Sequence, residues 1–192
     1  MLAAVSFDGL RETFWWQARL GINPLDFPGR SAVVGANTLG LAAAWLLTLG
    51  SILGAVALGR RLAGRHGGFW HEAGPAMLAF LPIAAGYHAA HYLVALLGNG
   101  QYLRAALGDP LGRGWTLLGP VHPSFGFVAN PDRVATFWNL QFALILGAHL
   151  LAVLIGLRVS GPRPLVAQLP MTTLMVAYTI LGLWLLASPT IG

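Results

Sequence analysis

The chain has 192 residues, 56% of them hydrophobic and only 9% charged, a balance that indicates an integral membrane protein and excludes an ordinary soluble domain. Its formal net charge of +5 comes from arginines scattered among loops, so we expect no nucleic-acid partner. Because the chain contains no cysteine, disulfides, thiolate metal sites and iron–sulfur clusters are excluded, and a metal would need His, carboxylate, Tyr or Met ligands.

The N-terminal stretch combines large apolar side chains with few charges. These side chains are Phe14, Trp15, Trp16, Leu20, Ile22 and Phe27. The composition is typical of a short interfacial helix that lies in the headgroup layer and is anchored by its aromatic rings. The stretch lacks the basic segment and apolar run of a cleaved signal peptide, so we expect insertion to begin with the first spanning helix.

Four stretches have the length of about 20 mostly apolar residues that a transmembrane helix needs. They cover residues 32–58, 75–97, 135–157 and 165–187. The sequence contains no internal repeat. We therefore predict an all-α fold in which residues 1–192 form one transmembrane domain, a four-helix bundle.

Arginines in the links between the spans predict the orientation. The link after the first span contains Arg60, Arg61 and Arg65, and the short link after the third contains Arg158 and Arg163. The positive-inside rule places these two links in the cytoplasm, and therefore places both termini outside. We expect this topology in a prokaryotic cytoplasmic membrane.

The long middle link, residues 98–134, is rich in glycine and proline. These residues exclude a long regular helix there. Trp115, Phe125 and Phe127 make the link too apolar for a disordered segment. We expect a structured extracytoplasmic loop.

The first span carries small residues at four-residue spacing. They are Ala32, Ala36, Gly40 and Ala44, followed by a GxxxG pair at Gly50 and Gly54. Such spacing lets another helix backbone approach closely. It favours assembly with a second copy of the chain, as a homo-oligomer, or with a partner membrane subunit, in addition to contact with the lipid bilayer.

Three histidines lie inside apolar runs, where an ionisable side chain is costly and usually functional. His88 and His91 are in the second span, and His149 is in the third. Tyr87 and Tyr92 flank the first pair at helical spacing, which puts these four side chains on one side of the helix. At about 1.5 Å per residue, His88, His149 and Tyr178 come to similar depths.

This arrangement leaves three interpretations open. His88, His91 and His149 can hold a transition metal (Cu, Fe or Zn), with Tyr87, Tyr92 and Tyr178 orienting the rings. A b-type haem can instead lie between His149 and His88 or His91, although four-helix dihaem cytochromes use two separate His pairs. The second interpretation is a proton or solute pathway. The third is that the histidines only form hydrogen bonds with neighbouring helices.

Other titratable residues give weaker signals. His66 and His71 lie in the first link and His122 in the middle one. The carboxylates Asp8, Glu12, Asp26, Asp109 and Asp132 fall outside the membrane on this topology. They can gather cations at the outer mouth or simply face solvent.

The strings GYHAAHYL, LGAHLLAVLIG and LPMTTLMVAYTILGLWLLASP together resemble the C-terminal half of multi-pass membrane proteins of bacteria and archaea with no assigned activity. The likeness extends over most of the chain, from SFDGL and INPLDFPGRSAV onward. In that pattern a further histidine ends the third-span string, where this chain has the region from Gly156 to Arg158. The resemblance implies paired intramembrane histidines but no activity.

Together these features predict a polytopic membrane protein with an intramembrane His/Tyr site that binds a transition metal or haem for electron transfer or oxidoreduction. The alternative is a non-enzymatic transport, proton-relay or scaffold subunit of a membrane complex.

Overall fold

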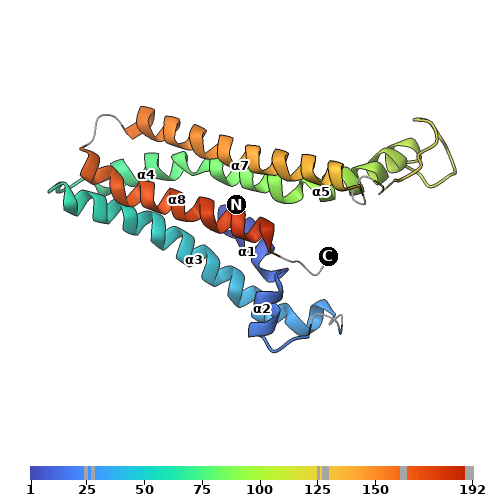
Figure 1. Ribbon diagram of the computed structural model, residues 1–192, viewed down its shortest axis with the longest axis horizontal. Coiled ribbons are helices and arrows are strands. Elements are labelled where there is room, and N and C mark those ends of the chain that lie inside the picture. The colour runs from blue at the N-terminus through green and yellow to red at the C-terminus, as the bar shows by residue number, and fades with distance from the viewer. Residues whose placement is uncertain (24–25, 27–28, 125, 127–129, 161–163, 189–192) are drawn as a thin grey trace.

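The computed structural model describes residues 1–23, 26, 29–124, 126, 130–160 and 164–188. All the regular secondary-structure elements in these residues are helices, which confirms the all-α class. The helices are α1 (Leu2–Arg11), α2 (Phe14–Arg19), α3 (Arg30–Leu62), α4 (Phe69–Ala79), α5 (Leu81–Gly108), α7 (Pro131–Ser160) and α8 (Leu165–Ala187). Figure 1 shows the long helices side by side, with α1 enclosed among them.

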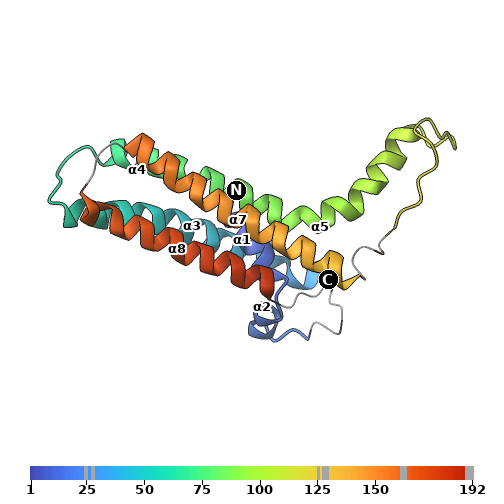
Figure 2. The same cartoon turned by 45° about the horizontal axis from the view of Figure 1, so that its top comes forward.

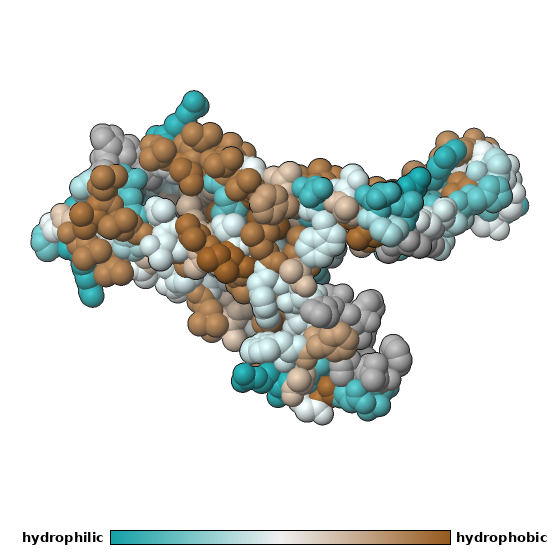
Figure 3. All heavy atoms as spheres, in the orientation of Figure 1, coloured by the Kyte–Doolittle hydropathy of each residue, from teal (hydrophilic) through white to brown (hydrophobic). Residues whose placement is uncertain are grey.

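Four helical segments are long and apolar enough to cross a membrane. They are Ser31–Leu62, Phe69–Gly108, Pro131–Val159 and Leu165–Ala187. In the most apolar 18 residues of each segment, only 11 to 28% are buried inside the protein. Hydrophobic side chains cover much of the surface seen in Figure 3. This arrangement fits a multi-pass membrane protein whose outer surface is solvated by lipid.

The second span is two helices that meet at Phe80. Pro82, in the first turn of α5, has no N–H to donate to the helix before it, so α4 ends at Ala79. At its other end α5 continues to Gly108 and leaves the bundle (Figure 2). The prediction that residues 98–134 exclude a long regular helix was therefore wrong for residues 98–108, where Gly98 and Gly100 lie within a helix that ends at Gly108.

Close helix packing occurs at glycines other than the predicted GxxxG pair. A Cβ at Gly86 of α5 would overlap the Ala148 methyl of α7, and one at Gly59 of α3 would overlap the Ala167 carbonyl of α8. Gly50 and Gly54 have no such neighbours. Small residues therefore fix the α5–α7 and α3–α8 pairs within the chain.

Helix α1 is an unexpected part of the core. It packs against α3, α5 and α8 and buries Leu2, Val5 and Phe7. Leu2 belongs to a set of mutually packed buried side chains that we call the central cluster: Leu2, Ile52, Ala79, Phe80, Ile83, Ala84, Ala152 and Met175. The ten-residue helix is too short to span the membrane, and it occupies part of the bundle interior.

Helix α2 packs beside the beginning of α3 and the end of α8. The Trp16 indole donates a hydrogen bond to Asn37 at 3.1 Å, and the Trp15 ring meets Trp184 edge to face. Arg19 lies over the Trp15 ring. The headgroup-layer position expected for this aromatic segment stays a prediction.

Candidate functional site

The Asp8 carboxylate of α1 contacts charged and polar groups from two helices. Arg11, one turn further along α1, approaches it to 2.6 Å. From α5, the Tyr92 hydroxyl donates a hydrogen bond to Asp8 Oδ2, and His91 Nε2 lies 3.3 Å from the same oxygen. We call Asp8, Arg11, His91 and Tyr92 the Asp8 cluster.

Packing fixes the imidazole of His91. Its ring stacks on the Tyr87 ring at a centroid distance of 6.3 Å, and Gly9 of α1 lies against both rings. Tyr87 is only 4% exposed, and its ring also meets α8, where a Cβ at Gly182 would come within 3.2 Å of it. Helices α1 and α8 therefore hold the ring that supports His91.

A groove of about 480 Å³ borders the Asp8 cluster. Asp8 and Arg11 line it from α1, and His88 and Tyr92 line it from α5. The His88 and Tyr92 rings are 4.6 Å apart. On the α3 side the lining includes Asn37 and Thr38 among apolar residues, so the groove reaches the cluster between three helices.

Electrostatics keep Asp8 ionised. Burial raises the pKa of its carboxyl, but the Tyr92 hydrogen bond and the charges of Arg11 and His91 outweigh burial and hold the pKa below its usual 3.8. The Asp8 and His91 side chains are each 20% exposed. The ionised carboxylate and the imidazole are therefore both partly shielded from solvent.

His149, the third predicted ligand, is anchored to its own helix. Its Nδ1 lies 2.8 Å from the Ile145 carbonyl and donates to it, and its Nε2 is buried without a hydrogen-bond partner. Within the described parts of the chain, no group of three or more His, Asp or Glu side chains is placed to hold a metal ion. The structure therefore does not bring His88, His91 and His149 together as a metal-binding group.

The three predicted tyrosines have different surroundings. Tyr87 and Tyr92 contact His91 and His88 as described above. Tyr178 lies elsewhere: its hydroxyl shares a 2.8 Å hydrogen bond with Thr48 of α3, and its ring meets Phe80 edge to face.

Comparisons of the chain with protein-family models, with curated proteins and with solved structures give no match. The resemblance to bacterial and archaeal membrane proteins stays a prediction. Function is inferred below from the contacts of this chain alone.

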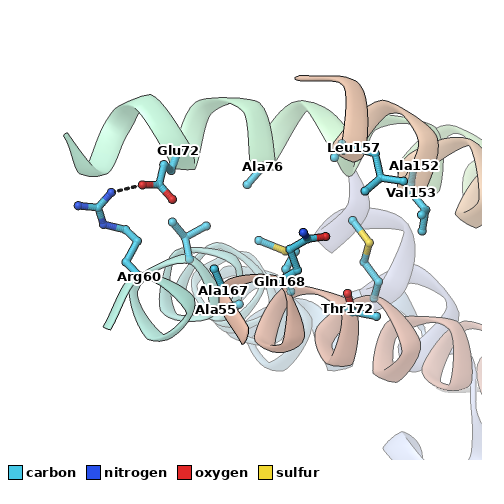
Figure 4. A pocket seen from close by; sticks show the side chains of 15 residues that line it. Ala55, Arg60, Glu72, Ala76, Ala152, Val153, Leu157, Ala167, Gln168 and Thr172 are labelled. Carbon is cyan, nitrogen blue, oxygen red and sulfur yellow. Dashed lines mark hydrogen bonds and ion pairs between the residues drawn. The ribbon is translucent and has the colours of Figure 1, made fainter. Parts of the chain in front are cut away.

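A second polar site lies at the other end of the bundle. Arg60 of α3 pairs with Glu72 of α4 and also donates to the Gly67 carbonyl. Arg65 Nε is 3.3 Å from Glu72 Oε1. Both side chains of the Arg60–Glu72 pair are only 9% exposed, and the pair stands at one end of a cavity among α3, α4, α7 and α8 (Figure 4).

Sequence reasoning missed Asp8, Arg11 and the Arg60–Glu72 pair as site residues. Asp8 and His91 are 83 residues apart, and they meet only because α1 folds into the bundle. The available signal was the spacing of α1, where Asp8 and Arg11 are one turn apart and Val5 and Gly9 form a buried side. For Glu72, the signal was a single carboxylate in a link with three arginines.

Proposed function

We propose that this protein is a multi-pass membrane protein in which the Asp8 cluster exchanges protons, as part of a proton relay or proton-coupled transport. The observation that carries the proposal is the contact between the His91 imidazole and the Asp8 carboxylate, which itself lines a groove between α1, α3 and α5. Ionisable groups at this depth are costly and typically mark proton relays or solute pathways.

The proposed chemistry uses His91 as the group that takes up and releases the proton. Neutral His91 donates its Nε2 proton to Asp8 and keeps a lone pair on Nδ1. A proton that binds Nδ1 gives an imidazolium, which the Asp8 carboxylate stabilises. Arg11 and Tyr92 hold the carboxylate in place during both states.

The predicted topology places this exchange in the outer half of the membrane. The groove is lined by α3 residues near the beginning of that helix, including Asn37 and Thr38, whereas Arg60 and Arg61 lie in its last turn. With both termini outside, α2 lies in the outer headgroup layer and the middle link forms an extracytoplasmic loop. A second copy or a partner subunit in a prokaryotic cytoplasmic membrane can complete the pathway.

Proton flux into proteoliposomes with a trapped pH-sensitive dye tests the proposal. Under an imposed potassium diffusion potential, we expect the protein to conduct protons, and Asp8→Asn and His91→Gln to reduce the flux to that of protein-free vesicles. Glu12→Gln, which changes the other carboxylate beside Arg11, and His122→Gln in the middle loop are matched controls that should conduct normally. Flux equal to empty vesicles in the unmodified protein, or normal flux in both cluster variants, would overturn the proposal.

A transition metal or b-type haem bound by His149 and by His88 or His91 is the second candidate. The unpartnered Nε2 of His149 favours it, because histidine ligands commonly donate their other N–H to a backbone carbonyl. Metal analysis and an absorption spectrum of the purified protein separate the two candidates. The proton-exchange proposal expects no stoichiometric metal and no Soret band, whereas a metal or haem that both His88→Ala and His149→Ala remove would favour the second candidate.

A further inference from the structure

The cavity beside the Arg60–Glu72 pair lies among four helices (Figure 4), and its α7 wall includes Val153 and Leu157, which are 44% and 55% exposed. We call it the inner cavity. Its walls consist mostly of small or flexible apolar side chains, with a few polar groups. The apolar residues are Ala55, Val56, Ala76, Ala79, Ala152, Val153, Gly156, Leu157, Ala167, Met171 and Met175.

The size of the inner cavity restricts what it can hold. Its volume is about 90 Å³, whereas an apolar cavity that binds benzene measures about 150 Å³, and a water occupies about 30 Å³ in the liquid. A ring compound the size of benzene is therefore too large. A few water molecules fit.

Polar groups line the cavity at several points. Glu72 and Arg60 form one end, and Gln168 and Thr172 of α8 supply further donors and acceptors (Figure 4). A cavity stays hydrated when its walls offer each water two to four polar partners. Nearby water also lowers the free-energy cost of removing a carboxylate and a guanidinium from solvent.

We propose that the inner cavity is a water chamber, through which hydrogen-bonded water reaches the interior of the bundle from the Arg60 end. This inference rests on the proposed function and extends it, because the chamber supplies the inner part of the proton path. Protons cross such a chain by hopping, each water accepting one proton and passing another on, so the water is unchanged. Arg65, whose side chain is 44% exposed, lies at the entrance.

The central cluster closes the chamber at its deep end. Ala79, Ala152 and Met175 line the inner cavity and also belong to that cluster. Leu2 joins the same cluster, and Asp8 follows six residues later on α1, about 9 Å away at the rise of an α-helix. An apolar septum thus separates the inner chamber from the Asp8 cluster, so the path is not an open pore.

Cysteine accessibility tests the chamber without reference to proton flux, because the natural chain has no cysteine. Ala76→Cys on α4 and Gln168→Cys on α8 place a thiol in the chamber from two separate helices. Leu39→Cys, on the lipid-facing side of α3, and Ile83→Cys, within the central cluster, are the dry controls. The probe is Ag⁺, and unreacted thiol is measured with a fluorescent maleimide after unfolding.

We expect Ag⁺ to react with both chamber thiols at least about tenfold faster than with either control, because thiolates form only where water is present. Reaction of both chamber thiols at the rate of the controls would overturn the water chamber. Fast reaction in a protein that conducts no protons would leave the chamber standing and remove the proposed function. Slow reaction of both chamber thiols in a protein that conducts protons, with the flux lost in Asp8→Asn, would remove the water chamber and leave the proposed function standing.

Discussion

Each end of the bundle holds a carboxylate beside an arginine, but the two pairs are built differently. Asp8 and Arg11 lie one turn apart on one helix, and their side chains are 20% and 42% exposed. Arg60 and Glu72 join two helices and are each 9% exposed. The imidazole of His91 also contacts Asp8, whereas the guanidinium of Arg65 also contacts Glu72.

The difference indicates a division of roles between the two ends. Imidazole is the side chain that normally changes protonation near neutral pH, so the Asp8 cluster can alternate between two charge states. The Arg60–Glu72 pair instead joins α3 to α4 through two side chains that are each only 9% exposed. We therefore expect the Arg60–Glu72 pair to organise the fold and the Asp8 cluster to exchange protons.

The largest expected effect comes from removing one partner of the buried pair. Arg60→Ala removes the buried guanidinium that pairs with Glu72, and the loss of stability should be about 3–5 kcal/mol. Thermal unfolding in detergent measures it, with Arg61→Ala, at an exposed neighbouring position, as the control. Equal unfolding temperatures for the two variants would show that the buried pair does not organise the fold.

Removing the arginine at the other end should have a smaller effect on stability. Arg11 is partly exposed and pairs within its own helix, so Arg11→Ala should cost about 1 kcal/mol or less. The same thermal measurement applies, together with the proton-flux assay. A loss as large as that of Arg60→Ala would remove the distinction between the two ends.

The smallest effect is a pH dependence that comes from Asp8. The pKa of Asp8 lies below its usual 3.8 in the folded protein. The carboxylate therefore contributes stability above its unfolded pKa, and this contribution is lost as the pH falls through the folded pKa. The unfolding temperature should fall more steeply below about pH 4 in the unmodified protein than in Asp8→Asn, and parallel curves would contradict the assignment.

The spans were the most predictable part of the fold, because membrane insertion needs long apolar runs that composition reveals. The fourth span, residues 165–187, coincides with α8. The end of α5 was missed because hydropathy marks the edge of the membrane and not the end of the helix. Residues such as Gln101 and Arg104 continue the helix beyond the apolar stretch.

The candidate site was only half predictable. Helical spacing placed His88, His91, Tyr87 and Tyr92 near one another, and their rings do make contact. The counter-charge, Asp8, comes from a helix too short to be detected as a span, and its position depends on packing between distant segments. Depth estimates alone also could not show that His149 bonds to its own helix.

The position of α1 has a consequence for the order of assembly during synthesis. Val5 packs in one buried cluster with Tyr87, Ile145 and Leu185, which come from α5, α7 and α8. Helix α1 is synthesised before these three helices, so it finds this set of neighbours only after α8 has been inserted. We therefore expect the docking of α1, which brings Asp8 to His91, to follow the insertion of α8.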